Sequence, residues 1–134
     1  MIGSKEVYSA LDRIKNKFPD AGNNGLTWKE GGDFKENYNE DFVLQVNEAC
    51  HWCKNVAFTH PLRKSYTTYT SYNIKHTMEK WLKLGNSICE DRYPYISNMA
   101  AITAFEICGI SYKVVSQYCN PYTNISAKSL NYLN

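Results

Sequence analysis

The chain has 134 residues, of which 43% are hydrophobic and 14% aromatic. This length fits one domain covering residues 1–134, and this composition excludes an intrinsically disordered chain. The formal net charge of +2 is too small to indicate nucleic-acid binding through overall charge alone.

The first half of the chain predicts two helices joined by a loop. In residues 5–18, apolar side chains recur at the helical period, and Pro19 ends the pattern. Residues 19–39 are rich in glycine and asparagine, which predicts a flexible connection. Residues 41–58 form the second predicted helix, which has an acidic start and an apolar stripe.

The second half predicts a third helix, a central fourth helix and a short terminal one. Residues 70–84 begin at the N-cap pair Thr70-Ser71 and stop at Gly85. Residues 97–108 are apolar nearly all round, so we expect this helix to form the middle of the core. Residues 126–133 predict a short last helix.

The predicted fold class is therefore mainly α, a compact helical domain of four to six helices around residues 97–108. Residues near 110–115 fit either a short strand or a continued helix, because Tyr112, Val114 and Val115 favour strands.

The basic charge is concentrated beside a run of tyrosines. Residues 60–83 carry five Lys/Arg and one Glu, a net charge of +4. We expect the third helix to expose a side that includes Lys75 and Glu79, opposite a buried side of Ile74, Met78 and Trp81. Cations beside aromatic rings are typical of nucleic-acid or acidic-partner binding, although a solvated helix face is an equally good interpretation. The candidate binding residues are Arg63, Lys64, Tyr66, Tyr69, Tyr72, Lys75, His76, Lys80 and Lys83.

Cys50 and Cys53 form a C-x-x-C pair, which could indicate zinc or redox chemistry. Both lie within the apolar stripe of the second helix, so we expect them to pack in the core as small hydrophobic residues. No second C-x-x-C supplies further ligands, and we predict neither a metal site nor a cofactor. Five cysteines without a regular framework fit free thiols in a reducing, cytoplasmic setting.

No sequence motif of a known catalytic class is present, and we predict that the chain is not an enzyme. Lys75, His76 and Glu79 could together supply acid–base groups, but their predicted helix face is exposed. Glu106 stands alone on the apolar fourth helix. We expect it to emerge at the helix end or to pair with Lys75, His76, Arg92 or a tyrosine hydroxyl.

Three segments resemble a group of small proteins carried by phages, plasmids and other mobile elements. They read Thr-Ser-Tyr-Asn-Ile-Lys-His from residue 70, Tyr-Ile-Ser-Asn from residue 95 and Asn-Pro-Tyr-Thr-Asn-Ile-Ser from residue 120. The resemblance covers about the last half of the chain and leaves residues 1–65 unmatched. The group commonly has a glycine where this chain has Met99. The resemblance implies a viral or mobile-element setting and no established activity.

The leading hypothesis is a non-enzymatic accessory protein that binds nucleic acid, either RNA or single-stranded DNA, or a nucleoprotein complex. One alternative is an anti-CRISPR-type inhibitor directed at a host defence protein, and a further one is a virion structural component. We expect a location in the host cytoplasm and no membrane partner, because no apolar run approaches the ~20 residues that span a bilayer and residues 1–6 lack a signal-peptide pattern.

Overall fold

The computed structural model describes residues 1–21, 25–26, 39–66, 69–89, 91–114 and 120–130. Within these ranges the chain is mainly helical, as predicted, with one short antiparallel sheet. The helices are α1 (Ser4–Lys17), α2 (Glu40–Asn55), α3 (Ser71–Trp81), α4 (Asn98–Cys108) and α5 (Ala127–Leu130). The strands are β1 (Tyr112–Lys113) and β2 (Tyr122–Thr123). A 3-10 turn, Ala57–Thr59, follows α2, and a π turn, Leu82–Asn86, follows α3.

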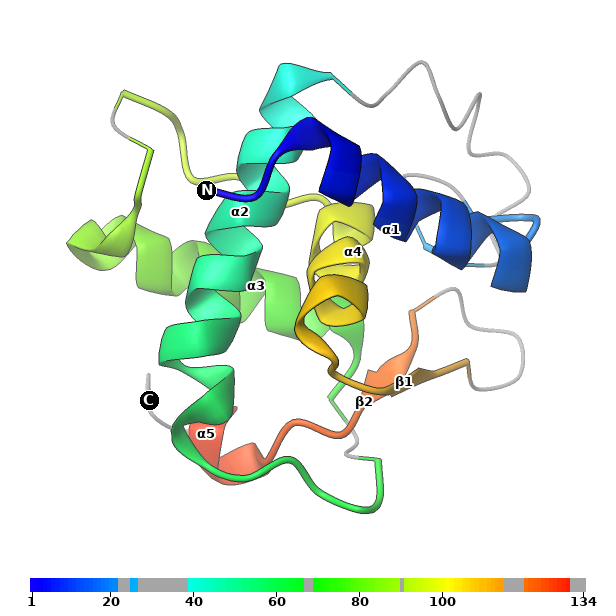
Figure 1. Cartoon of the computed structure of the whole chain (residues 1–134). Helices are drawn as coiled ribbons and strands as arrows, with labels where there is room; N and C mark the ends of the chain where they lie inside the picture. The colour runs from blue at the N-terminus through cyan, green and yellow to red at the C-terminus, as the bar shows by residue number, and fades with distance from the viewer. Residues whose placement is uncertain (22–24, 27–38, 67–68, 90, 115–119, 131–134) are drawn as a thin grey trace.

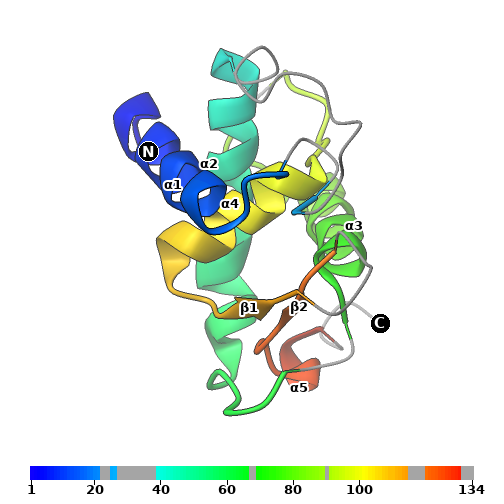
Figure 2. The ribbon, with the colours of Figure 1, turned by 90° about the vertical axis from the view of Figure 1, so that its right-hand side faces the viewer.

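Helix α4 is the centre of the fold, as the sequence predicted. It packs against α1, α2 and α3, and its ribbon lies among theirs in both views (Figures 1 and 2). Met99, Ile102 and Phe105 are fully buried. Ser97 caps the first turn, and Gly109 ends the helix with a φ of +76°, a conformation that favours glycine. A helix that is apolar on all sides is stable only when other elements enclose it.

Helices α2 and α3 begin at polar N-cap residues, and the cap of α3 is the one that the sequence indicates. The Asn39 side chain accepts a hydrogen bond from the Phe42 amide at the start of α2. Thr70 and Asn73 form a reciprocal capping box at the start of α3. Helix α1 ends at Lys17, shortly before Pro19. These local signals explain why the observed bounds lie within a few residues of the predicted ones.

In the described part of the ambiguous segment after α4, Tyr112–Lys113 form strand β1, and the helix does not continue. Strand β1 pairs with β2 in antiparallel register, with Tyr112 opposite Thr123 and Lys113 opposite Tyr122. An isolated bridge between Thr70 and Tyr122 joins β2 to the start of α3. The small sheet thus holds the chain after α4 against α3 (Figure 2).

Two predicted features lie wholly or partly outside the described residues. Most of the connection predicted at 19–39 and the last residues of the helix predicted at 126–133 belong to this group. Among the helices that the structure describes, none has the length and apolar character needed to cross a membrane.

Candidate functional site

Helix α3 is joined along its length to the chain segment that precedes α4. The Lys75 ammonium donates a hydrogen bond to the Ile96 carbonyl at 3.1 Å. The Ile96 amide donates to Oε2 of Glu79 at 3.0 Å. Because both polar groups of one residue are bound by side chains of α3, the backbone around Ile96 is fixed against this helix.

Lys75 is buried, which corrects the prediction that it lies on the exposed side of α3. Only 8% of the residue is exposed. Its ammonium lies 3.8 Å from Glu79 Oε2, and the Ile96 carbonyl supplies a further partner. A lysine can be buried when its apolar stem packs and its charge is paired in this way. Lys75 therefore holds α3 to the next segment.

Two tyrosine rings lie close to this ammonium. The Lys75 Nζ is 5.6 Å from the centre of the Tyr72 ring and 5.1 Å from that of Tyr95, within the range of cation–π attraction. His76 contacts Tyr72 edge-on, with ring centres 4.6 Å apart, and pairs with Glu79 Oε1 at 3.0 Å. Tyr72 remains 48% exposed and Tyr95 44% exposed. The inner side of each ring is thus supported, while about half of each residue faces solvent.

A third exposed ring, Tyr93, extends this surface toward the end of α3. Tyr93 is 73% exposed, and the Lys83 ammonium lies 5.5 Å from its ring centre. On α3, Tyr72, His76 and Lys80 follow at intervals of four residues, which places them on one stripe. Lys83, in the π turn that follows, extends this stripe toward Tyr93. We call this surface the tyrosine face. It comprises Tyr72, His76, Lys80, Lys83, Tyr93 and Tyr95.

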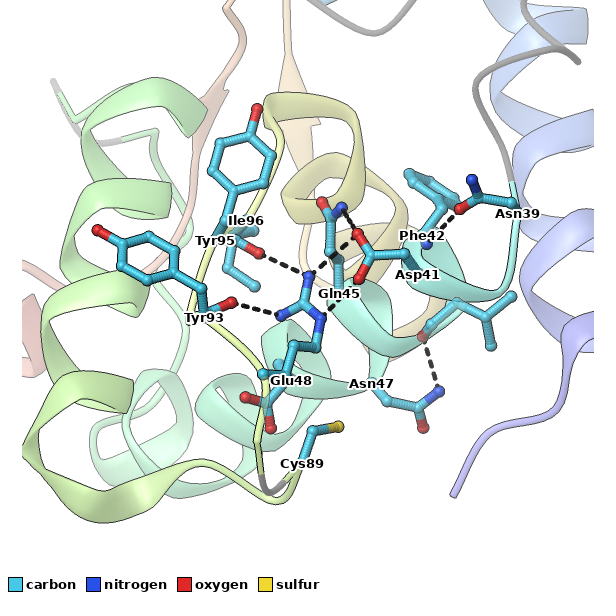
Figure 3. A network of polar contacts seen from close by, with 12 residues as sticks. Asn39, Asp41, Phe42, Gln45, Asn47, Glu48, Cys89, Tyr93, Tyr95 and Ile96 are labelled. Atoms are coloured by element: carbon cyan, nitrogen blue, oxygen red, sulfur yellow. Dashed lines mark hydrogen bonds and ion pairs between the residues drawn. The ribbon is translucent and has the colours of Figure 1, made fainter.

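Arg92 fixes the backbone that carries Tyr93 and Tyr95. Its guanidinium donates to Asp41 Oδ1 at 2.8 Å and to the carbonyls of Tyr93 and Tyr95 at 3.2 and 3.1 Å. The hydrogen bond from Arg92 holds the pKa of Asp41 below its usual value. Gln45 donates to Asp41 at 2.9 Å. Figure 3 shows the rings of Tyr93 and Tyr95 directed away from Asp41.

Two residues of α2, Gln45 and Glu48, anchor the ends of the same segment. Gln45 Oε1 accepts a hydrogen bond from the Ser97 amide at 2.8 Å. Glu48 is completely buried and accepts from the Ile88 amide at 2.7 Å and from the Ser87 hydroxyl at 2.6 Å. Charged groups are rarely buried unless they are paired or hydrogen-bonded. Here the buried carboxylate fixes the turn that leads from α3 toward Tyr93 (Figure 3).

The three segments that carry the sequence resemblance meet at one point of the fold. The Ser71 hydroxyl donates to Asn98 Oδ1 at 2.7 Å, and Asn98 Nδ2 donates to Asn120 Oδ1 at 2.6 Å. The Ser71 amide also donates to the Pro121 carbonyl at 2.9 Å. Side chains that are distant in sequence thus join the start of α3, the start of α4 and the approach to β2.

The remaining predicted binding residues lie outside the tyrosine face. Arg63 and Lys64 are exposed, and the Arg63 backbone bonds to Asn124. Tyr66 borders a separate hollow of about 310 Å³, and the Lys113 ammonium lies 6.0 Å from its ring. Tyr69 is exposed just before α3. The basic run at 63–83 is therefore divided between different parts of the surface.

Sequence reasoning missed Tyr93 and Tyr95. The signal was present, because Arg92-Tyr93-Pro94-Tyr95 combines a cation with two aromatic residues. This segment comes after α3 and lies outside the basic stretch of the sequence. Its place on this surface follows from contacts in the fold, among them those of its rings with Lys75 and Lys83.

Glu106 has partners that differ from most of those expected. It accepts from Lys17 at 2.9 Å and from the Tyr112 hydroxyl at 3.2 Å, and it lies 3.5 Å from Arg13. A tyrosine hydroxyl was among the predicted partners, whereas Lys75, His76 and Arg92 are engaged elsewhere. The ion pairs join α4 to α1, not to α3. Burial, followed by the nearby Glu106 charge, raises the pKa of Tyr112.

Cys50 and Cys53 are buried in the core, as predicted. The four cysteines that the structure describes, namely Cys50, Cys53, Cys89 and Cys108, are free thiols. No group of three His, Cys, Asp or Glu side chains within the described ranges could hold a metal ion.

Comparisons of this chain with protein-family models, with curated protein sequences and with solved structures gave no match. Function must therefore be inferred from the residues and their geometry.

Proposed function

We propose that this chain is a non-enzymatic protein that binds single-stranded nucleic acid, either RNA or DNA, on the tyrosine face. The observation that carries the proposal is the presence of three exposed tyrosine rings on backbone fixed by hydrogen bonds, with Lys83 beside the Tyr93 ring and Lys80 exposed on the same stripe of α3 as Tyr72. Unpaired bases stack on such rings with about 1–3 kcal/mol per base. The two lysines would contact phosphates.

The charge of this surface predicts how binding should depend on salt. Lys75 is paired with Glu79 inside the fold, so the exposed cations of the stripe are Lys80 and Lys83. For a single strand, each neutralised phosphate contributes about −0.7 to the slope of log K against log salt. We therefore expect a shallow slope of about −1.4 and an affinity that depends mainly on stacking.

The test is fluorescence anisotropy with labelled oligo-U and oligo-dT of about 12 nucleotides. Titrations between about 50 and 200 mM salt measure the slope. Tyr72→Ala and Tyr95→Ala should each weaken binding about tenfold, the equivalent of one stacked base. The matched control is Tyr66→Ala, because Tyr66 is also an exposed tyrosine beside a lysine but lies outside the tyrosine face.

Two outcomes would reject the proposal. One is the absence of binding to either oligonucleotide at the lowest salt concentration. The other is an equal loss of affinity in the Tyr66→Ala and Tyr72→Ala variants, because a specific stacking site cannot be equally sensitive to both. The mobile-element setting and the host cytoplasm remain part of the proposal. The first rests on the sequence resemblance, and the second on five cysteines without a regular framework.

A second candidate function is the binding of a host protein, as an inhibitor of a defence nuclease complex would require. It is favoured by Leu84, which is 68% exposed, and Ile88, which is 41% exposed; both belong to the turn region after Lys83. Aliphatic side chains add little to nucleic-acid binding but are common in protein contacts. In nuclease-treated host lysate, a protein that co-purifies with the wild type and is lost with Leu84→Asp would favour this function.

A further inference from the structure

The end of α4 borders a hollow whose lining is rich in aromatic residues. Its volume is about 310 Å³, within the range of about 300–1,000 Å³ that is typical of small-ligand sites. We call it the aromatic hollow and define it by six residues of its lining, namely Lys17, Phe18, Tyr66, Glu106, Gly109 and Tyr112. None of the six belongs to the tyrosine face, so the hollow is a second and separate candidate site.

The walls of the aromatic hollow suit a flat ring. The ring centres of Phe18 and Tyr112 lie 6.3 Å apart, with the ring planes tilted by 42°. Tyr66 comes from another segment, the loop before α3, and is 42% exposed. At Gly109 an added Cβ would meet no atom within 4 Å, so the space beside this backbone is open. Aromatic rings attract one another at centre distances of about 4.5–7 Å, so a further ring could pack against these walls.

Glu106 is the carboxylate of the hollow, and its charge is already paired. Its side chain is 11% exposed. Oε1 accepts a hydrogen bond from the Lys17 ammonium at 2.9 Å and lies 3.5 Å from Arg13, while Oε2 accepts from the Tyr112 hydroxyl at 3.2 Å. Glu106 therefore holds Lys17 and Tyr112 in place at the wall of the hollow.

The charge that remains beside the hollow is positive. The side chains of Lys17 and Arg13 are 55% and 52% exposed. Lys113 is also exposed, and its ammonium lies 6.0 Å from the centre of the Tyr66 ring. Among the described residues that make these contacts with the lining, three are cations and one is a carboxylate. An ammonium has three N–H groups, so Lys17 can donate to an anion as well as to Glu106.

We propose that the aromatic hollow binds a small planar aromatic molecule that carries one anionic group, either a carboxylate or a phosphate. The ring would pack against Phe18, Tyr66 and Tyr112, and the anionic group would accept a hydrogen bond from Lys17. An organic cation fits less well, because Lys17 already lies 5.8 Å from the Tyr112 ring centre and Lys113 lies beside the Tyr66 ring. This site goes beyond nucleic-acid binding and does not depend on it.

The experiment records 1H–15N correlation spectra of the whole chain during titrations with matched small molecules. Indole-3-acetate is the carboxylate probe, and phenyl phosphate is the phosphate probe. Tryptamine and 3-methylindole carry the same indole ring with a positive charge and with no charge. We expect at least one anionic probe to shift the amide signals of residues 109–112, with a dissociation constant of about 1 mM or lower. Tryptamine and 3-methylindole should bind at least about tenfold more weakly, because neither can accept a charge-assisted hydrogen bond from the lysine. The difference between the two anionic probes identifies the anionic group that the hollow prefers.

Single variants test the two parts of the site. Lys17→Met should weaken binding of the better anionic probe about tenfold, and Tyr66→Ala should weaken it at least about threefold. The matched control is Lys5→Met, because Lys5 is an exposed lysine of the same helix that does not line the hollow. Tyr72→Ala should also leave this affinity unchanged, and a saturating excess of the probe should not displace labelled oligo-U. Failure of this site and failure of the nucleic-acid site are therefore distinguishable.

The proposal is overturned if neither anionic probe shifts the amides of residues 109–112 at about ten times the expected dissociation constant. It is also overturned if tryptamine binds as tightly as indole-3-acetate, or if the shifts are confined to other segments. These results come from the wild type alone, so they are decisive even if a variant fails to fold.

Discussion

Replacing Lys75 with methionine tests whether this residue supports the fold or contacts a ligand. Methionine keeps most of the apolar stem but removes the ammonium, and with it the hydrogen bond to the Ile96 carbonyl and the contact with Glu79. A hydrogen bond that involves a charged group contributes about 1.5–3 kcal/mol, and a buried acceptor left unpaired costs about 1–3 kcal/mol.

We therefore expect Lys75→Met to lower the free energy of unfolding by about 2 kcal/mol and the midpoint temperature by about 8 °C. Urea unfolding followed by tryptophan fluorescence measures the change, because Trp52 and Trp81 are both buried. The matched control is Lys80→Met on the same helix. Lys80 is exposed, so its replacement should change stability by less than about 0.5 kcal/mol.

The salt dependence of nucleic-acid binding should show the opposite pattern: it should change in Lys80→Met and not in Lys75→Met. Lys80→Met should reduce the salt slope by about 0.7, the contribution of one phosphate contact, whereas Lys75→Met should leave the slope unchanged. A Lys75→Met variant with wild-type stability and a reduced slope would contradict the buried, paired position of Lys75. That result would mean that Lys75 is an exposed phosphate ligand.

Three further substitutions test the structure around the tyrosine face and α4. Asp41→Asn should lower the free energy of unfolding at pH 7 by less than about 1 kcal/mol, because the carboxylate is largely exposed. The folded pKa of Asp41 lies below its ordinary value of 3.8, so this stabilisation is present above that value and lost as the pH falls through the folded pKa. Urea midpoints of wild type and variant should converge there, and a constant difference would contradict the assignment. Glu48→Gln should lower the free energy of unfolding in urea by about 2–3 kcal/mol, because the buried carboxylate that accepts a hydrogen bond from the Ile88 amide becomes an amide. An unchanged urea midpoint would show that Glu48 is not buried. Gly109→Ala should lower the free energy of unfolding by about 1 kcal/mol. The positive φ alone accounts for this loss, because the added Cβ would meet open space. Thermal stability equal to that of the wild type would rule out this backbone conformation.

The helices could be predicted because their signals are local. The apolar composition around Ile102 and the caps at Thr70 and Ser97 depend only on neighbouring residues, so the sequence indicates the central helix and the starts of α3 and α4. The residues of the small sheet were ambiguous, because two-residue strands carry too little pattern to be distinguished from a helix end.

The candidate surface could be predicted only in part, because its geometry depends on contacts between distant segments. Lys75 follows the buried Ile74, at the boundary between the two sides of α3, and the position of Ile96 decides whether it is covered. Arg92 reaches Asp41 across 51 residues of sequence. Periodicity within one helix cannot indicate such partners, so the sequence identified the stripe on α3 but not the tyrosines beside it.

The meeting point of Ser71, Asn98 and Asn120 has a consequence for how likeness to other proteins should be interpreted. These side chains bond to one another inside the molecule, whereas Tyr72 and Tyr95, which belong to the same sequence segments, face solvent. Proteins that share only the inward residues would have a common scaffold with unrelated partners. Proteins that also share the two tyrosines would be expected to recognise the same kind of ligand.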